Sequence, residues 1–308
     1  MVLLVERPGK LYFKLENHHP HQQEALDDAS LESFRSDVSS FLGRLSLNLK
    51  PGLEILSLAW FQQCLELVHS INKAFAKLLV EIDYPVTKWE MKSMEEYFNY
   101  SLNLLDFMNN ISSCLSHLRQ SRLLLSHGLS LVEKSPSTAL EHVKAIRLKR
   151  LIKDSEEKYN KVSIQGSCSS SKEGIIQQGL MEMESIGYWV CGIVLAGLSG
   201  DSDQYLKRKE AGKITNSTLI RMDASVSEAM EKGGLVKEVK ELNDAADCLV
   251  SAITTKGESR NAVEELQKRL EAFEKLLDVL GKEVDCLFKE VLAGRNQMLN
   301  GIRQQQKQ

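Results

Sequence analysis

The chain has 308 residues, of which 43% are apolar and 26% are charged, and its formal net charge is −3. That apolar content is too high for an intrinsically disordered chain, and the length allows one large domain or two ordinary ones. The nearly balanced charge argues against bulk nucleic-acid binding, which normally uses a strongly basic domain.

The distribution of proline indicates a helical protein. The chain has five prolines, and none lies after residue 136. Proline inside a helix removes a backbone hydrogen bond, so a long proline-free stretch permits long helices. Apolar residues recur at helical spacing along most of the chain, and no segment alternates in the manner of a strand. We therefore predict an all-α fold, an elongated bundle of long antiparallel helices that ends in a long, heptad-patterned helix.

The N-terminal part is predicted to contain a tail followed by helices. Residues 1–27 are polar and are interpreted as a flexible tail. Helices are expected at about 29–48 and 53–82. The sequence Lys-Pro-Gly at 50–52 interrupts the first pattern, and Tyr-Pro at 84–85 ends the second.

The next predicted helix has a marked start. Thr87 and Glu90 form a capping-box sequence, in which the threonine hydroxyl caps the helix and the glutamate reaches back. We expect this helix to continue to about residue 132. A more charged helix is expected at about 137–160.

Residues 163–174 form the best linker sequence in the chain, because serine and glycine are concentrated there. The linker separates an N-terminal helical part, residues 28–162, from a C-terminal helical part, residues 175–308. We expect the two parts to pack together as one domain.

Residues 186–198 form an uncharged segment. As a helix it would rise about 20 Å, short of the roughly 30 Å hydrocarbon core of a membrane. A buried core helix is therefore favoured, and a membrane-inserted segment is the open alternative. Gly192 and Ala196 form a small-xxx-small step that allows close helix contact. The candidate buried or membrane-contacting residues are Tyr188, Trp189, Gly192, Ala196 and Gly197.

The last predicted helices lie at about 216–231, 235–255 and 259–303. The third has apolar residues at alternating steps of three and four, which is the a/d pattern of a helix that buries one narrow stripe. This heptad seam consists of Val263, Leu266, Leu270, Phe273, Leu277, Leu280, Val284, Leu287 and Val291. Two interpretations remain open: packing against helices of the same chain, and a coiled coil with a partner.

A basic patch begins at Lys144. The basic residues interleave with leucine and isoleucine, and they are Lys144, Arg147, Lys149, Arg150 and Lys153. An amphipathic helix of this kind can bind anionic lipid headgroups. The same pattern is also typical of a solvated helix with an apolar underside.

No motif for catalysis, metal binding or nucleotide binding is present. The sequence has no glycine-rich phosphate loop, no G-x-S-x-G turn and no C-x-x-C pair among its six cysteines. We therefore predict a protein that is not an enzyme and uses no cofactor, metal or nucleic acid. The predicted partner is a protein, which the sequence does not identify.

The cysteines are interpreted as reduced, small apolar residues of an intracellular protein. The apolar run at residues 1–5 is too short for a secretory signal, and Glu6 follows at once. We expect a cytoplasmic location, with attachment to or insertion into an internal membrane as an open alternative.

Several short motifs resemble those of the plant BYPASS family. In chain order they are LSLAW at 56–60, YPVTKWE at 84–90, LLD at 104–106, RLLL at 122–125, KEVDCLFK at 282–289, VLAGR at 291–295 and LNGIR at 299–303. The order and spacing of the motifs make the match fairly specific, and it covers about residues 30–303. Asn296 stands where an acidic residue is expected.

The resemblance implies a regulator of plant root and shoot development. Members of the family are associated with restraining a root-derived mobile signal that arrests shoot growth, and no enzymatic activity or cofactor follows from the family. A more distant group is linked to exocyst-type secretion, which suggests a membrane-peripheral adaptor as the alternative. A second alternative is a binder of, or an enzyme for, a small apolar signal precursor. Family members have been named chloroplast proteins, but this N-terminus gives little support for a transit peptide.

Overall fold

The computed structural model describes residues 20–47, 55–148, 171–201, 205, 216–231 and 236–305. Within these residues it contains eight α-helices, one short 3-10 turn and no strand. The elements are α1 (Pro20–Leu47), α2 (Leu58–Glu81), η1 (Val86–Lys88), α3 (Met91–Leu131), α4 (Pro136–His142), α5 (Ser171–Ser199), α7 (Ser217–Glu231), α8 (Lys237–Thr254) and α9 (Arg260–Gln305). The predicted all-α bundle of long helices, with a long helix at its C-terminal end, is confirmed.

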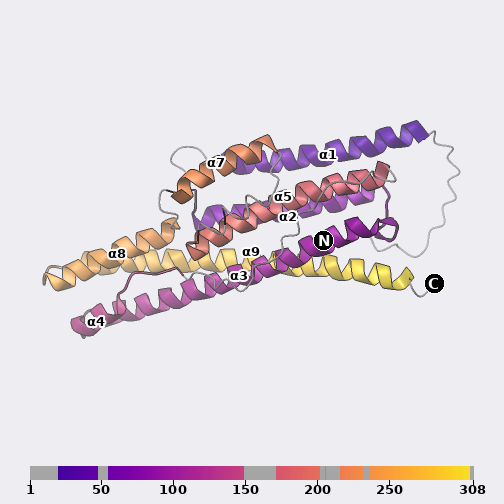
Figure 1. The fold of residues 1–308 in the computed structure, drawn as a ribbon. Coiled ribbons are helices and arrows are strands. Elements are labelled where there is room, and N and C mark those ends of the chain that lie inside the picture. The colour runs from indigo at the N-terminus through magenta and orange to yellow at the C-terminus, as the bar shows by residue number, and fades with distance from the viewer. Residues whose placement is uncertain are drawn as a thin grey trace.

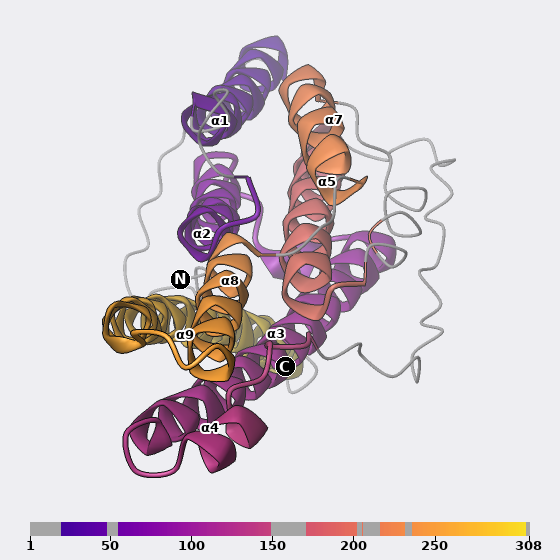
Figure 2. The ribbon, with the colours of Figure 1, turned by 90° about the vertical axis from the view of Figure 1, so that its left-hand side faces the viewer.

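The helices form an elongated bundle of three layers (Figure 1). α1 and α7 form one outer layer, α2 and α5 form the middle layer, and α3 and α9 form the opposite outer layer. α8 packs along α9, and α4 folds back on the end of α3. An end-on view shows α5 enclosed between α7 and α3 (Figure 2). α5 contacts four helices, α1, α2, α3 and α7, and is therefore the centre of the fold.

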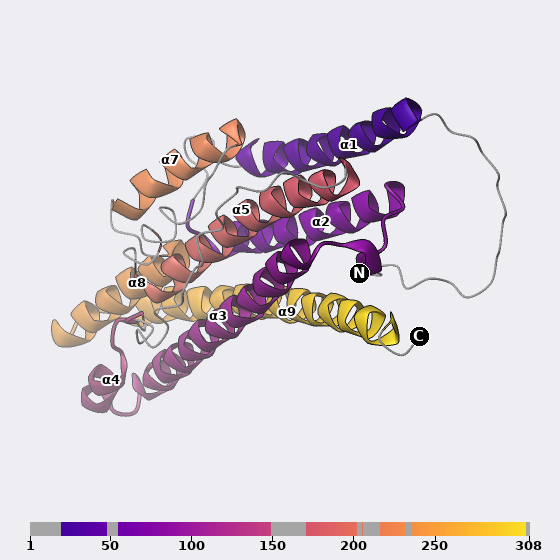
Figure 3. The same ribbon diagram turned by 45° about the vertical axis from the view of Figure 1, so that its right-hand side comes forward.

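Neighbouring helices run in both directions (Figure 3). α3 and α9 are antiparallel, because Arg122 of α3 pairs with Glu274 and Arg295 of α9 reaches back to Phe98. α3 and α5 are parallel, because residue numbers increase in the same direction along both helices. Ser93 of α3 contacts Glu173 of α5, and Asn103 of α3 contacts Tyr188 of α5. Parallel packing of α3 and α5 requires a long connection, which the residues between α4 and α5 provide.

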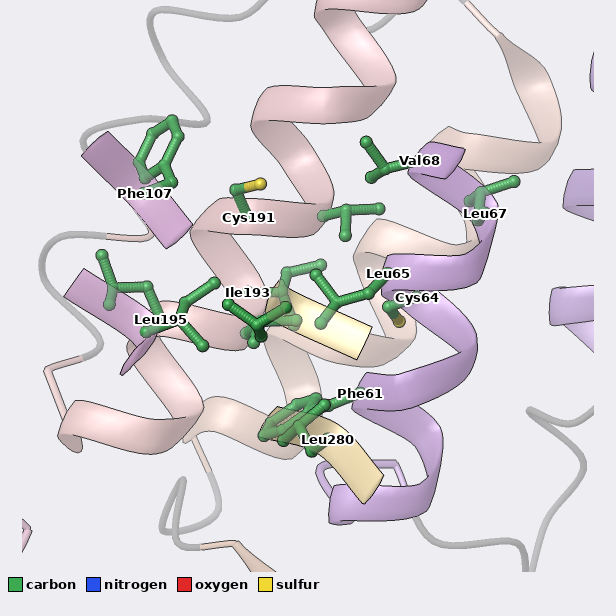
Figure 4. Packing of buried hydrophobic residues seen from close by; sticks show 14 of the residues in the cluster. Phe61, Cys64, Leu65, Leu67, Val68, Phe107, Cys191, Ile193, Leu195 and Leu280 are labelled. Carbon is green, nitrogen blue, oxygen red and sulfur yellow. The ribbon is translucent and has the colours of Figure 1, made fainter. Parts of the chain in front are cut away.

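The core is one continuous cluster of apolar side chains. Figure 4 shows members of this cluster, among them Phe61 of α2, Ile193 of α5 and Leu280 of α9. Each of these three side chains has no exposed surface. Burial at this depth is worth about 1.5–3 kcal/mol for each large apolar side chain, before the loss of conformational entropy.

Two polar side chains fix the start of α2. The Ser57 side chain accepts a hydrogen bond from the Trp60 amide at 3.2 Å, which is an ordinary N-cap of α2. Glu238 of α8 also accepts from the Leu58 amide, at 3.1 and 3.2 Å. A carboxylate is favourable there because the N-terminus of a helix has a partial positive charge.

The capping box predicted at Thr87 is wrong. Val86–Lys88 forms a 3-10 turn, Trp89 is extended with φ −66° and ψ 145°, and α3 begins only at Met91. The N-cap residue is Glu90, whose own side chain makes no capping hydrogen bond. The Trp89 ring is 5% exposed, and its burial in the core moves the helix start past the threonine.

The helix predicted at about 137–160 is confirmed only as far as His142 and is wrong for residues 143–148. α4 ends at His142, and residues 143–148 have no regular secondary structure. Asn243 of α8 holds this segment, because its side chain accepts from the Ile146 amide at 2.6 Å and donates to the Ile146 carbonyl at 3.2 Å. Lys144 and Arg147 of the basic patch are therefore exposed on an irregular, non-helical segment, and residues 149–160 lie outside the described residues.

Two segment boundaries differ from the sequence estimate. α1 begins at Pro20, inside the stretch interpreted as tail, and residues 1–19 lie outside the described residues. α5 begins at Ser171, so residues 171–174 of the expected linker are helical. Residues 163–170 of that linker lie outside the described residues.

Two adjacent residues of α9 allow a test of which face of this helix points into the core. Leu280 has no exposed surface, whereas Val279 is 42% exposed. We expect Leu280→Asp to lower the free energy of unfolding by about 4 kcal/mol or more, because it removes buried apolar contacts and places a charge in the core. Val279→Asp is expected to change it by no more than about 0.5 kcal/mol. Urea denaturation measures both, and similar effects from the two variants would contradict the orientation.

Candidate functional site

The nine residues of the heptad seam lie on α9. Eight of them are 5% exposed or less, and Val263 is partly buried. Their neighbours are α2, α3 and α8 of the same chain. The structure thus places these side chains in the core of the chain itself, where they serve helix packing.

The seam is longer than the sequence pattern suggested. Gly294 and Met298 continue the alternating steps after Val291, and both are buried. The apolar pattern in the sequence ends at Val291 because Gly294 has no apolar side chain. The spacing alone, without regard to hydrophobicity, would have extended the seam.

Arginines cross the seam between α3 and α9. Arg119 donates to the Leu277 carbonyl at 3.0 Å, and Arg122 pairs with Glu274 at 2.9 Å. Arg295 donates to the Phe98 carbonyl at 2.5 Å, and its guanidinium lies 5.0 Å from the centre of the Phe98 ring. Because a guanidinium has several donors in a fixed plane, these contacts fix the register of the two helices.

The apolar segment at 186–198 is the C-terminal half of α5. Among its candidate residues, Trp189, Gly192, Ala196 and Gly197 are buried and Tyr188 is partly buried. Lys172–Ser199 is the one described helix that is long and apolar enough to cross a membrane, and 72% of its apolar window is buried inside the chain. In this conformation the segment is a core helix.

Close packing of α5 depends on glycines that the small-xxx-small step did not identify. A Cβ atom at Gly187 would lie 2.6 Å from the Tyr100 hydroxyl, and one at Gly197 would overlap the Phe61 ring. The two aromatic rings therefore rest directly on the α5 backbone. Gly197 was among the candidate residues of this segment, but only the positions of Tyr100 on α3 and Phe61 on α2 show why a side chain is excluded at Gly187 and Gly197.

The first turn of α5 holds the corner between α2 and α3. Lys172 donates to the Ile82 carbonyl at the end of α2, at 2.5 Å. Glu173, which is fully buried, accepts from the Glu90 amide at 3.2 Å and from the Ser93 hydroxyl. A cation thus meets the negative end of one helix and a carboxylate meets the positive end of the next.

Two further carboxyl groups lie along the α3–α5 interface. The Glu96 side chain is 14% exposed, and its nearest cation is Lys92 at 4.0 Å. Burial is the main cause that raises the pKa of Glu184 to about 8, and the Glu96 carboxylate raises it further. Burial also raises the pKa of Glu96. The positive charge of Lys92 lowers that pKa, and the Glu173 carboxylate raises it. Sequence reasoning missed this pair because Glu96 and Glu184 are 88 residues apart.

Asp223 of α7 forms a buried polar node with α5. It is 4% exposed, accepts from the Trp189 indole nitrogen at 3.0 Å and also accepts from the Tyr205 hydroxyl. Buried polar groups are costly unless they are hydrogen bonded, so this node specifies how α7 sits on α5.

The outward side of α9 has a regular charge pattern, which we call the outer face of α9. Four acids and four lysines each recur every seventh residue, and all eight are exposed. The acids are Glu264, Glu271, Asp278 and Asp285, and the lysines are Lys268, Lys275, Lys282 and Lys289. Each acid lies one helical turn before a lysine, an arrangement that favours the helix. The lysine column extends about 32 Å along the helix.

The part of the chain that the structure describes contains no group of three or more His, Cys, Asp or Glu placed to hold a metal ion. His69 and Glu290 do meet across α2 and α9, with Nδ1 and Oε2 at 2.5 Å. The polar groups described above cap helices, fix the register between helices or form ion pairs across helix interfaces.

These features define a class of protein: an all-α bundle of long helices with a buried apolar helix at its centre. The family model described as Protein BPS1 matches residues 86–300, from η1 to the last turns of α9. The chain belongs to this family, which confirms the resemblance that the motifs indicated.

Named relatives agree with this assignment. UPF0496 protein 4 of Oryza sativa subsp. japonica is 27% identical over 237 residues, covering 68% of this chain and 52% of the relative. Protein BPS1, chloroplastic, of Arabidopsis thaliana is 31% identical over 103 residues, covering 33% of this chain and 29% of the relative. The chain spans about half the length of the rice relatives it matches. No solved structure matches the chain.

Gly197 provides a test of the packing of α5. We expect Gly197→Ala to destabilise the fold by about 1–3 kcal/mol, because the new methyl group overlaps the buried Phe61 ring. Gly301→Ala on α9 is the matched control, since nothing lies within 4 Å of the added Cβ atom. The control is expected to stabilise by about 0.5–1 kcal/mol. Thermal unfolding compares the two, and a neutral Gly197→Ala would show that Phe61 does not rest on α5.

Proposed function

We propose that this protein is a non-enzymatic helical interaction protein that acts in plant root and shoot development. The single observation that supports this most is membership of the BPS1 family over residues 86–300. We further propose that it restrains a root-derived mobile signal that arrests shoot growth. It would do so through a protein partner, without a cofactor or a metal.

The arrangement of α9 supports a specific mode of partner binding. The heptad seam is buried against α2, α3 and α8, so a folded protein cannot offer it to a partner. The outer face of α9 remains accessible, with its acidic and lysine columns in parallel lines. Rows of opposite charge set the alignment and the specificity of an interface more than its raw affinity. We propose this face as the partner surface.

A membrane-peripheral adaptor in secretion is the second candidate function, and the observation that favours it is α5. This helix meets the length and composition of a membrane span, although 72% of its apolar window is buried. The exposed basic residues Lys144 and Arg147 would face an anionic surface. We propose a cytoplasmic location, at or near an internal membrane; the Arabidopsis relative, in contrast, is named chloroplastic.

Charge reversal on the outer face of α9 tests the leading proposal. We expect Lys275→Glu with Lys282→Glu to reduce capture of the partner from root tissue at least tenfold, and to abolish rescue of shoot growth in plants that lack the protein. Both lysines are exposed, so the free energy of unfolding should change by no more than about 1 kcal/mol. Affinity purification with mass spectrometry, followed by complementation, measures the two effects.

Lys134→Glu with Lys240→Glu is the matched control, because it makes the same charge change at exposed positions outside α9. The control should retain both capture and rescue. Full rescue by the α9 variant would reject the outer face as the partner surface. Capture that requires intact membranes, combined with fractionation into the membrane pellet, would instead favour the adaptor. Gently purified protein that rescues growth, holds no protein partner and retains a small apolar molecule would favour a carrier or an enzyme.

A further inference from the structure

The lysine column on the outer face of α9 has no ion pair within the described part of the chain. The ion pairs of α9 use other cations, namely Arg260 and Arg269 of α9 itself and Arg119, Arg122 and His69 of neighbouring helices. Each lysine of the column is exposed and follows an acid by four residues. None of these acid–lysine steps is closed by an ion pair along the helix, so the ammonium groups are free to bind charges outside the chain.

The acidic and lysine columns run side by side along α9, on the side that faces away from the bundle. Acids and lysines alternate at steps of four and three, so both columns stay on one face of the helix. The helices packed on α9 are α2, α3 and α8, and α9 lies in an outer layer (Figure 1). Asp278 is 3.6 Å from Arg119 of α3, yet its side chain is still 59% exposed. The charged face extends about 38 Å, from Glu264 to Lys289.

The order of the charges makes this face complementary to itself in one orientation. In two antiparallel helices, residues at equal distances on opposite sides of the two-fold axis lie opposite each other. With the axis level with residues 276 and 277, every acid of one column therefore faces a lysine of the other copy. Glu271 faces Lys282 of the second copy, and Asp278 faces Lys275 of the second copy.

Parallel arrangements of two α9 helices do not have this complementarity. In a parallel pair in register, acids face acids and lysines face lysines, which is repulsive. A parallel pair that is shifted along the helix has no two-fold symmetry, and its unpaired ends would continue into an open filament. The charge pattern therefore favours a closed, antiparallel pair.

We propose that the partner of the outer face of α9 is a second copy of this chain, which forms an antiparallel, two-fold symmetric dimer through the acidic and lysine columns. This inference rests on the proposed function, which assigns the outer face to partner binding. A two-fold contact uses the same patch on both copies, so it closes at two chains.

An exposed apolar column beside the lysines adds buried surface to this contact. Ala272, Val279, Cys286 and Ala293 recur every seventh residue, and all four are exposed. In the antiparallel pair, Ala272 lies beside Val279 of the second copy, so both side chains leave water. Rows of charge set the alignment of an interface more than its affinity, whereas burial of apolar surface contributes to the affinity.

Analytical ultracentrifugation of the full-length protein gives the first test. We expect a monomer–dimer equilibrium in low salt at micromolar concentrations. Because the ion pairs lie at the surface, the dissociation constant should rise at least about tenfold between about 0.05 M and 0.5 M salt. A protein that remains monomeric in low salt would overturn the proposal.

Charge reversal of either column should break the dimer, and reversal of both should restore it. Lys275→Glu with Lys282→Glu places acids opposite acids, and Glu271→Lys with Asp278→Lys places lysines opposite lysines. Each double variant should raise the dissociation constant at least about tenfold. The variant with all four changes should dimerise again, as should an equal mixture of the two double variants. The four-residue variant has the natural net charge, so its recovery would come from the pairing itself.

Lys134→Glu with Lys240→Glu is again the matched control and should leave the dissociation constant within about twofold of the natural value, because both positions are exposed and outside α9. Circular dichroism checks that each variant is folded. If one double variant does not fold, the four-residue variant alone decides, since it must dimerise as the natural protein does. Failure of both the four-residue variant and the mixture to dimerise would overturn the antiparallel pairing.

The same variants separate this inference from the proposed function. A monomeric natural protein whose Lys275→Glu/Lys282→Glu variant still loses partner capture and rescue would reject the second copy, and would leave the outer face as the surface for another protein. A dimer with the expected charge dependence, combined with full rescue by the monomeric variant, would support the dimer and reject the proposed function of this face.

Discussion

Burial of α5 is the constraint on which the rest of the bundle depends. This helix contacts α1, α2, α3 and α7, and it brings the Tyr100 and Phe61 rings directly onto its backbone at Gly187 and Gly197. An apolar helix of this length must be covered on nearly every side to avoid water. The layered arrangement follows from that requirement, because α1 and α7 cover one side of α5 and α3 covers the opposite side.

Polar contacts decide how the layers are aligned. The adjacent residues Lys172 and Glu173 meet the end of α2 and the start of α3, so a single turn of α5 fixes the corner between two other helices. Arg295 and Arg119 do the same for the register of α3 against α9. Apolar packing is nearly indifferent to small shifts along a helix, whereas hydrogen-bonded groups are not.

Several residues of the motifs that resemble the family have structural roles in the bundle. The motif at 56–60 contains the N-cap of α2, the motif at 84–90 forms the corner before α3, and Arg295 crosses the α9 seam. Family membership therefore reports the architecture most directly. A partner must bind to the exposed surface of the bundle. On α9, the most regular exposed feature is the set of acidic and lysine columns on its outer face.

The sequence by itself determined the helical class, the approximate extent of α2 and α9, and the buried stripe from Leu266 to Val291. These depend on local periodicity, which a helix imposes on residues three and four apart. Only the tertiary structure decided the start of α3, the non-helical segment at 143–148 and the raised pKa of Glu184. The start of α3 depends on burial of Trp89 and on the Glu173 carboxylate, and the 143–148 segment depends on Asn243. The pKa of Glu184 depends first on burial among packed helices and then on Glu96. Hydrogen bonds and charges act across space, so such partners become visible only when the helices are packed.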